Sequence, residues 1–555
     1  MTTVSEKLPE SIDLSHHLSN ISKARPLSPL KGLQKYWGRP GLISLAGGLP
    51  SPDYFPFSSV GADILLPTNF PTQAGTPNGP LSWLWNLFSS EKTEPITIPR
   101  YASNPGDLDL ANTLQYSMAS GQPKLREFAK EITDKVFRPA YSNYTILAHV
   151  GNTDGWMKAV LTLCNPGEGV LTTVWTFPSA LVCMEPYNIK PVPVLMDGEG
   201  MRADALRELL LTWDAEARGM PRPHVMYTIP VGQNPTGATM GAARKKEIYD
   251  VCVEFDIIIV EDDPYYFLQE GPYLPKDSRN SLRQRQLNTT GFVEELVPSY
   301  LRFDYQGRVI RLETLSKTIA PGCRLGWFTC NPLFAERLER QAETSTQAPC
   351  GFGQALVITT LSKWGFDGYL RWLQGQIVIY FTKKLSTQPS VLSLGLQNQY
   401  AVRRDYIVDC LADEFDLRMG TVPCDVDCFS GRDVYTAYPK SKHLTMAEKQ
   451  ILTDEPLFSF VPPTSGMFVW LKLHLDRHPK HGIMDSNDLE LALWKELAEA
   501  GVLFGPGQLF AADATVQEAD IEGHFRISFS NAEFDDLKKA ISIFSRVIVK
   551  FFRTS

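Results

Sequence analysis

The stretch that decides the fold covers residues 225–264 and reads VMYTIPVGQNPTGATMGAARKKEIYDVCVEFDIIIVEDDP. Its apolar ends, 225–229 and 257–260, do not alternate with polar residues, which is typical of strands buried on both faces of a sheet. Between them, 241–255 has the amphipathic pattern of a helix. The order strand, helix, strand predicts a βαβ unit, and therefore an α/β fold with a largely parallel sheet.

A third buried strand is predicted at 309–312, and polar residues follow all three strands directly. These polar segments are the turn 232–237, the acidic end 261–264 and the run 314–317. Ligands bind beyond the carboxyl ends of the strands in open α/β sheets. We therefore expect the three segments to contribute to one site.

Lys317 follows the third strand and is the predicted nucleophile of this site. A lysine becomes reactive when its pKa falls, and a buried strand end beside a cationic partner favours that change. Arg324 has the planar fork that binds phosphate, and Thr314 and Ser316 can add hydroxyl donors. The pattern Thr-x-Ser-Lys followed by Arg-x-Gly predicts a lysine that holds a phosphorylated cofactor as a Schiff base.

The acidic strand end predicts a partner for the ring nitrogen of a pyridine cofactor. A carboxylate at that nitrogen keeps it protonated, which makes the ring an electron sink. We prefer Asp263 to Asp262, because Tyr266 follows Asp263 by three residues and can donate its hydroxyl to the phenolic oxygen of the cofactor. Asn234 precedes a proline and is held extended, so its amide can reach the ring oxygen and a substrate carboxylate.

Three further segments are candidates for holding cofactor and substrate. Asn152 and Thr153 begin a predicted helix, where free backbone N–H groups bind phosphate. Phe177 can stack on a flat ring. Arg526 lies in an apolar strand, where a substrate α-carboxylate would satisfy both arms of its fork. Taken singly, these residues also fit an ordinary N-cap, a core ring and a structural ion pair.

Length and composition narrow the class of protein. The chain has 555 residues, whereas a single core rarely grows past roughly 250–300, so two or more domains are expected. The net charge of −8 argues against nucleic acid or an anionic membrane surface as the main partner. The N-terminus carries no signal-peptide pattern, and no apolar run reaches the 18 or so residues of a membrane span.

Cysteine and histidine usage favours a cytoplasmic enzyme without a metal. The nine cysteines are scattered and have no framework spacing, which suits a reducing compartment. Cys424 and Cys428 lack a second matching pair, and His474 and His478 lack the glutamate of a zincin site.

The sequence also suggests an approximate division into domains. We expect an N-terminal arm at 1–60, an insertion at 61–110, a large cofactor-binding domain at 111–387 and a small C-terminal domain at 388–555. Within the last, the irregular composition of about 388–458 suggests a second insertion.

Eight segments in the expected order resemble fold-type I pyridoxal-phosphate aminotransferases. Within that family, the chain is similar to the fungal aromatic-amino-acid aminotransferases and the kynurenine/2-aminoadipate aminotransferases. The segments are Ser44–Pro50, Leu114–Ser117, Asn165–Gly167, Asn234–Gly237, Glu261–Leu268, Ser316–Lys317 with Arg324, Ser465–Phe468 and Arg526–Ser530.

The resemblance implies a large domain with a mostly parallel seven-stranded sheet, a smaller α+β domain and pyridoxal 5'-phosphate as cofactor. It also implies a homodimer with shared active sites, in which Tyr116 reaches the phosphate of the neighbouring subunit and Gly48 lines the substrate pocket. Arg526 would hold the substrate carboxylate, and Lys317 would move the proton between Cα and the C4′ carbon of the cofactor.

Two positions depart from the family pattern. The phosphate loop usually carries Ser-Gly-Ser or Thr followed by Gln, whereas this chain has Val150-Gly-Asn-Thr-Asp154. Asp154 is an acid near a phosphate, so we expect it to point away. Phe177 stands where the family usually has a tyrosine, which preserves stacking but removes the hydroxyl.

The implied activity is a ping-pong transamination from an aromatic or similarly large L-amino acid to a 2-oxo acid such as 2-oxoglutarate. A carbon–sulfur lyase or an aminocyclopropane-carboxylate synthase-like enzyme uses the same lysine, aspartate, tyrosine and arginine, so the motifs leave these reactions open. A ligand-sensing transcription regulator is a third alternative, although the resemblance begins too near the N-terminus for a DNA-binding domain.

Overall fold

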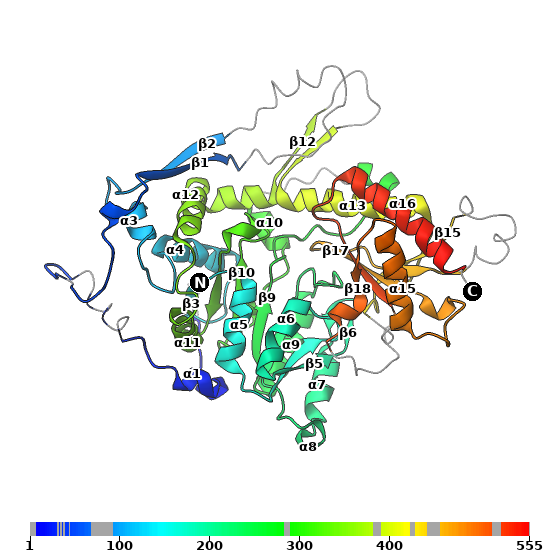
Figure 1. Ribbon diagram of the computed structural model, residues 1–555, viewed down its shortest axis with the longest axis horizontal. Helices are drawn as coiled ribbons and strands as arrows, with labels where there is room; N and C mark the ends of the chain where they lie inside the picture. The colour runs from blue at the N-terminus through cyan, green and yellow to red at the C-terminus, as the bar shows by residue number, and fades with distance from the viewer. Residues whose placement is uncertain are drawn as a thin grey trace, which may run out of the picture. The chain divides into compact units, whose positions relative to one another are not determined.

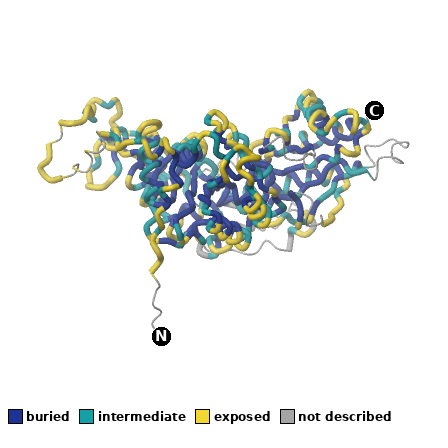
Figure 2. The backbone as a smooth tube through the Cα atoms, turned by 90° about the horizontal axis from the view of Figure 1, so that it is seen from below, coloured by how far each residue is buried: buried dark blue, intermediate teal, exposed yellow. Residues whose placement is uncertain are grey.

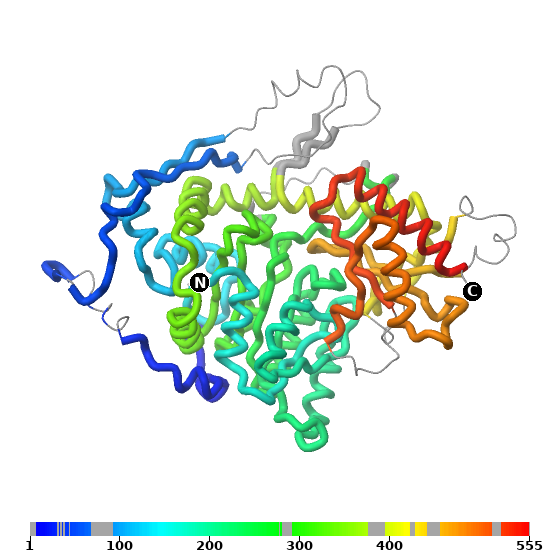
Figure 3. The backbone as a smooth tube through the Cα atoms, in the orientation of Figure 1, coloured from blue at the N-terminus to red at the C-terminus, as the bar shows by residue number. Residues whose placement is uncertain are grey.

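The computed structural model describes most of the chain in two compact units (Figure 1). The described residues are 7–29, 33, 36, 39–43, 45–67, 93–281, 289–380, 390–421, 428–440, 455–512 and 523–553. Unit 1 comprises residues 1–167, 257–264 and 287–396, and unit 2 comprises 168–256, 265–286 and 397–555. Each unit therefore combines three separate stretches of the chain, which Figure 3 follows by colour.

The large sheet has seven strands in the order β3-β11-β10-β9-β8-β4-β5. β9 (Ile258–Asp262) is parallel to β10 (Val309–Thr314), and β4 (Gly169–Thr173) is parallel to β5 (Lys190–Val194) and β8 (Val225–Thr228). β11 (Gly326–Cys330) runs antiparallel to β10 and to β3 (Thr145–His149). The predicted mostly parallel, seven-stranded sheet is confirmed.

Unit 1 buries β9 and β10 completely, as the continuous apolar runs predict. The helix α5 (Asn152–Leu163) packs against both strands, and Trp156 and Ala159 are among its buried side chains. Around this core lie α4 (Pro123–Ile132), η4 (Thr133–Phe137), α10 (Thr289–Glu295), α11 (Pro332–Glu343) and α12 (Gly351–Gln374). Residues 7–10, near the N-terminal end, are exposed (Figure 2).

Unit 2 contains the predicted strand β8 and the helix that follows it, α9 (Ala242–Glu254). A second sheet, with strand order β14-β15-β16-β17-β19-β18, is antiparallel throughout. It includes β16 (Phe458–Phe460), β17 (Phe468–Leu473), β18 (Gly505–Pro506) and β19 (His524–Ser528). Its apolar face packs against α15 (Ser486–Glu499) and α16 (Phe534–Phe551) in one hydrophobic core. The predicted second, α+β domain is confirmed, although its boundaries remain a prediction.

The two segments predicted as insertions contain regular structure in their described parts. In 61–110, β1 (Ser59–Leu65) pairs with β2 (Thr93–Pro99), while residues 68–92 lie outside the described residues. The range 388–458 includes α13 (Leu396–Glu414), β14 (Phe415–Thr421) and β15 (Asp433–Pro439). Residues 388–389, 422–427 and 441–454 of this range lie outside the described residues, and so does Ser44 of the resembling segments.

Candidate active site

The residues around Lys317 form a polar loop directly after β10. Lys317 is half-buried, three residues beyond the end of the strand. Thr314 Oγ1 donates a hydrogen bond to Ser316 Oγ at 2.9 Å, and Arg324 Nη1 donates to the same oxygen at 3.4 Å. The loop thus brings together the two hydroxyls and the guanidinium predicted to bind phosphate.

Gly151 brings the start of α5 against this loop. Its φ is +100°, and a Cβ at this position would overlap the Arg324 guanidinium. Its N–H donates to His149 Nδ1 at 3.1 Å, and burial lowers the pKa of His149 to about 3, so this ring is neutral. Only a glycine can adopt this backbone conformation and leave room for Arg324.

Asn152, the first residue of α5, connects the helix to the end of β9. Its Nδ2 donates to Asp262 Oδ1 at 2.6 Å and to the Leu312 carbonyl at 3.1 Å. Within the described residues, its Oδ1 has no hydrogen-bond partner. Asp262 therefore faces the N-terminus of α5, on the side of the candidate phosphate site.

The next two residues of α5 have different surroundings. Thr153 is exposed. Asp154 accepts from Lys158 Nζ at 2.5 Å and from the Val150 N–H at 3.1 Å. These contacts occupy the Asp154 carboxylate, in keeping with the expectation that it points away from a phosphate.

Asp263 has different surroundings from its neighbour Asp262. It is fully buried and accepts a hydrogen bond from Arg311 Nη1 at 3.1 Å. The same guanidinium lies 3.1 Å from Glu261 and 2.7 Å from Glu313. Sequence patterns did not single out Arg311 or Glu313, although two charged residues inside an otherwise apolar strand were a visible signal.

In unit 2, Arg526 and Asn234 are in direct contact. Arg526 Nη1 donates to Asn234 Oδ1 at 2.7 Å, and the guanidinium lies 4.3 Å from the Phe468 ring and 4.7 Å from the Phe510 ring. Burial lowers the pKa of Arg526, and its Nε has no hydrogen-bond partner among the described residues. A half-buried fork with an open donor fits a carboxylate ligand.

The two tyrosines after β9 differ in their neighbours. Tyr265 packs edge-on against Phe468 at 5.8 Å and interacts electrostatically with Arg526. The predicted Tyr266 is buried and packs against Phe267. Within unit 2, Tyr265 is therefore the tyrosine that accompanies Asn234 and Arg526.

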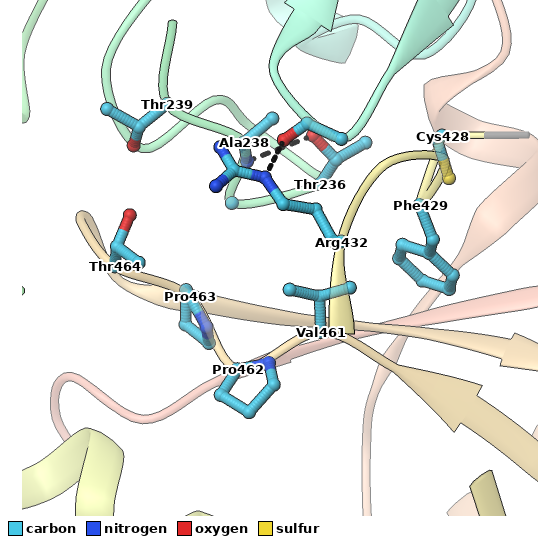
Figure 4. Close-up of a pocket in the computed structure, with 12 residues that line it drawn as sticks. Thr236, Ala238, Thr239, Cys428, Phe429, Arg432, Val461, Pro462, Pro463 and Thr464 are labelled. Atoms are coloured by element: carbon cyan, nitrogen blue, oxygen red, sulfur yellow. Dashed lines mark hydrogen bonds between the residues drawn. The ribbon is translucent and has the colours of Figure 1, made fainter. Parts of the chain in front are cut away.

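The turn that carries Asn234 is held rigidly. Gln233 Nε2 donates to the Trp175 carbonyl at 2.6 Å, and Gln233 Oε1 accepts from the Thr236 N–H at 2.9 Å. Residues of this turn line a small cavity of about 40 Å³ (Figure 4). In its lining, Arg432 Nε donates a hydrogen bond to the Gly198 carbonyl at 3.1 Å. This volume suits one or two waters and is too small for an amino acid.

Among the described residues, no hydrogen bond, ion pair or ring contact joins Phe177, Tyr116 or Gly48 to these clusters. Phe177 is half-buried at the start of α6 (Pro178–Met184). In unit 1, Tyr116 is 70% exposed, and no atom lies within 4 Å of the position that a Cβ on Gly48 would take. Both residues are thus accessible to a ligand or to a second subunit.

The unit 1 cluster fits the phosphate of pyridoxal phosphate. Gly151, Ser316 and Arg324 form one polar surface at the N-terminus of a 12-residue helix, where free N–H groups and the helix dipole favour an anion. Lys317 lies on the same loop as Ser316 and Arg324, and Asp262, at the end of β9, accepts a hydrogen bond from Asn152 at the start of α5. An α/β sheet that presents a lysine and this phosphate cradle together defines the class of fold-type I pyridoxal-phosphate enzymes.

Comparison with known proteins agrees with this class. The family model "Aminotransferase class I and II" matches residues 102–374. An aromatic amino acid aminotransferase of Schizosaccharomyces pombe is 34% identical over 98% of each chain, and the L-tyrosine:2-oxoglutarate aminotransferase atrD of Tapinella panuoides is 29% identical over 98% of this chain and 97% of its own. The crystal structure of the aminotransferase Aro8 from Candida albicans has a TM-score of 0.78 at 34% identity, covering 98% of this chain and 100% of that one.

The chain belongs to the class I and II aminotransferase family. It is a pyridoxal-phosphate-dependent enzyme that transfers amino groups between amino acids and 2-oxo acids. None of the helices in the described parts of the chain has the length and apolar character needed to cross a bilayer.

Proposed function

We propose that this enzyme transfers the amino group of an aromatic, or similarly large, L-amino acid to a 2-oxo acid such as 2-oxoglutarate. The observation that carries the proposal is the half-buried Arg526 fork, which donates a hydrogen bond to Asn234 and contacts two phenylalanine rings. A carboxylate on this fork would have aromatic neighbours suited to an apolar side chain. The names of the relatives in Schizosaccharomyces pombe and Tapinella panuoides support the same substrate class.

Pyridoxal 5'-phosphate, when bound, supplies the electron sink that stabilises negative charge at the substrate Cα. We infer that Lys317 holds the cofactor covalently. The phosphate of the cofactor is held by Arg324, Ser316, Thr314, Asn152 and Thr153. Gly151 leaves space between α5 and the Arg324 guanidinium. Phe177 stacks on the ring.

For the ring nitrogen, the geometry favours Asp262 in place of the predicted Asp263. Asp262 faces Asn152 at the phosphate end of α5, whereas Arg311 binds Asp263 in the interior. The three-residue spacing between acid and tyrosine also holds for this pair, because Tyr265 follows Asp262 by three residues. Tyr265 is also the tyrosine that interacts electrostatically with Arg526. We therefore assign the contact with the phenolic oxygen to Tyr265 and Asn234.

In each half-reaction the chain binds a carboxylate and moves a proton. Arg526 and Asn234 orient the substrate carboxylate, which fixes the Cα–H bond relative to the cofactor. Lys317 Nζ removes the proton from the substrate Cα and delivers it to the C4′ position. After the first 2-oxo acid leaves, a second one binds to the same arginine and the steps run in reverse.

Two further parts of the proposal concern assembly and location. We propose a homodimer in which Tyr116 reaches the partner's phosphate site and Gly48 lines the substrate pocket. We also propose that the enzyme works in the cytoplasm, since the eight described cysteines are all free thiols.

An absorbance spectrum of the purified enzyme, before and after addition of L-phenylalanine, tests the proposed reaction. We expect the visible band of the lysine-bound cofactor to disappear with the amino acid and to return with 2-oxoglutarate. If phenylalanine leaves the band unchanged while the enzyme forms product from another amino acid, that result would contradict the aromatic assignment. Product formation without recovery by any 2-oxo acid would favour a lyase.

A further inference from the structure

A buried charge cluster in unit 1 lies beside the candidate ring-nitrogen acid. We define the Arg311 cluster as Arg311 with Glu261, Asp263 and Glu313. Arg311 and Glu313 are two residues apart on β10, so both side chains emerge on the same face of the sheet. Side-chain exposures are 0% for Arg311, Glu261 and Asp263, and 3% for Glu313.

Arg311 connects the members of the cluster. Its Nη1 lies 3.1 Å from both Glu261 Oε2 and Asp263 Oδ2, and its Nη2 donates to Glu313 Oε2 at 2.7 Å. The guanidinium carbon is 3.9 Å from the centre of the Phe137 ring, which covers its flat face. These contacts hold Asp263 in the interior and so leave Asp262 to face Asn152.

The charge of the cluster depends on Glu313. With all three carboxyl groups ionised, one guanidinium faces three negative charges. Glu261 has additional donors, Ser299 Oγ at 2.5 Å and the Tyr300 N–H at 2.9 Å. Burial raises the pKa of Glu313 to about 7 despite the opposing attraction of Arg311, so Glu313 titrates near neutral pH.

We propose that Glu313 is a positioning residue of the cofactor site that acts through Arg311 and Asp263 on the adjoining Asp262. The inference rests on the proposed function, in which Asp262 serves the ring nitrogen. Ionised Glu313 adds negative potential beside Asp262, which makes nearby protons on the bound cofactor harder to remove. Protonated Glu313 removes that contribution.

The groups facing Glu313 set the direction of this effect. They are Arg311 on its own strand, Asp263 beyond β9, and Tyr369 on α12, whose own pKa is raised by burial and by Glu313. Tyr369 donates its hydroxyl to Thr318 Oγ1 at 3.0 Å, one residue from Lys317. Glu313 is thus linked to the acidic end of β9 through its ion pair with Arg311, and to the lysine loop through its electrostatic effect on Tyr369.

The first test is a pH titration of the visible absorbance of the holoenzyme, comparing wild type with Glu313→Gln. Because the substitution removes a negative charge, we expect the spectral midpoint to move to lower pH by about 0.5 unit. The matched control is Glu131→Gln, since Glu131 is exposed and pairs with Lys135 at 2.6 Å on the surface. The control should keep the wild-type midpoint.

Thermal unfolding of the apoenzyme over the same pH range separates positioning from a purely structural role. Wild type should lose stability as pH rises toward 7, because the raised pKa favours the protonated folded form, and Glu313→Gln should lack this loss. A lower unfolding temperature with an unchanged spectral midpoint would mean that Glu313 only supports the fold, and the proposal would be wrong.

An Asp263→Asn background tests the route. If Asp263 carries the effect, Glu313→Gln should shift the midpoint by less than half as much there. An undiminished shift would overturn the route through Asp263. Should Glu313→Gln not fold, Glu313→Asp replaces it: the shorter carboxylate lies farther from Arg311 and stays protonated to higher pH, so the spectral midpoint should again move to lower pH, and an unmoved midpoint would overturn the proposal.

Failure of this inference is distinguishable from failure of the proposed function. A visible band that persists in Lys317→Ala would overturn the proposed function, whatever Glu313→Gln does. A band that requires Lys317, combined with an unmoved midpoint in Glu313→Gln, would overturn only the role of Glu313.

Discussion

Asp262 and Asp263 are neighbours in the chain, but their side chains lie in different surroundings. Asp262 lies opposite Leu312 in the β9–β10 register and accepts from Asn152, while Asp263 is bound by Arg311. Spacing alone allowed either acid to pair with a tyrosine three residues later. Only the direction of each side chain distinguishes them, and that direction is set by the strand and its neighbours.

We predict that exchanging each acid for its amide separates chemistry from stability. Asp262→Asn should reduce transamination roughly 100-fold or more, since the ring nitrogen loses its charged partner. Asp263→Asn should mainly lower the free energy of unfolding, by about 1–3 kcal/mol, because Arg311 loses a buried acceptor. Steady-state kinetics and urea unfolding of both variants check this, and the opposite pattern would restore the Asp263 assignment.

Lys317→Ala should abolish turnover while leaving the fold intact. The lysine is half-buried on a loop and carries both the covalent link and the proton transfer. A loss of about 10²–10⁴-fold or more is expected for a group that moves a proton in the reaction. Turnover and circular dichroism provide the measurement, with the exposed Lys135→Ala as control; retained turnover in Lys317→Ala would disprove the mechanism.

At the scale of elements, the junction between β3 and α5 decides whether a phosphate can bind. The Arg324 guanidinium fills the space where a side chain on residue 151 would lie. His149, which accepts the Gly151 N–H, is fully buried and uncharged at neutral pH. The helix start, the glycine and the arginine therefore form one unit whose parts lie far apart in the sequence.

Gly151→Ala should weaken cofactor binding at least about 10-fold and destabilise the fold by about 1–3 kcal/mol. Gly167→Ala is the matched control, since Gly167 also has a positive φ, +89°, but no atom lies within 4 Å of its would-be Cβ. Strain alone would affect stability equally in both variants. Equal cofactor affinity in the two variants would contradict the proposed contact with Arg324.

The buried His149 also predicts how this junction responds to acid. Its folded-state pKa of about 3 lies below the ordinary 6.5, so its contribution to stability is present above pH 6.5 and is lost as pH falls. The loss should be about 1.4 kcal/mol per pH unit below 6.5. Urea unfolding of the apoenzyme at several acidic pH values, with His149→Gln for comparison, measures the difference; identical slopes would refute it.

At the scale of the whole molecule, each of the two units contains residues that the proposed chemistry uses. Unit 1 holds Lys317 and the phosphate cradle, and unit 2 holds Asn234, Tyr265 and the Arg526 fork. Tyr116 and Gly48 are accessible and have no role within one chain that the described contacts explain. A second copy of the chain would give both residues a function.

Hybrid dimers test this arrangement. Lys317→Ala and Tyr116→Ala should each be nearly inactive, but a co-expressed mixture should recover activity. One site of each hybrid would combine a normal lysine with the partner's normal tyrosine. With random pairing of the two variants, about a quarter of all active sites should be functional, compared with all of them in wild type. No recovery of activity would show that Tyr116 serves its own subunit.

The sequence by itself determined the buried strands, the polar segments at their ends and the lysine motif, because hydrophobic runs and local spacing encode these features directly. The apolar run around Arg526 also predicted the strand that the structure shows as β19. Only the tertiary structure decided which acid faces α5, which tyrosine accompanies Arg526, and that Arg311 binds three carboxylates. Those outcomes depend on side-chain direction and on neighbours distant in the chain, which spacing within one segment does not specify.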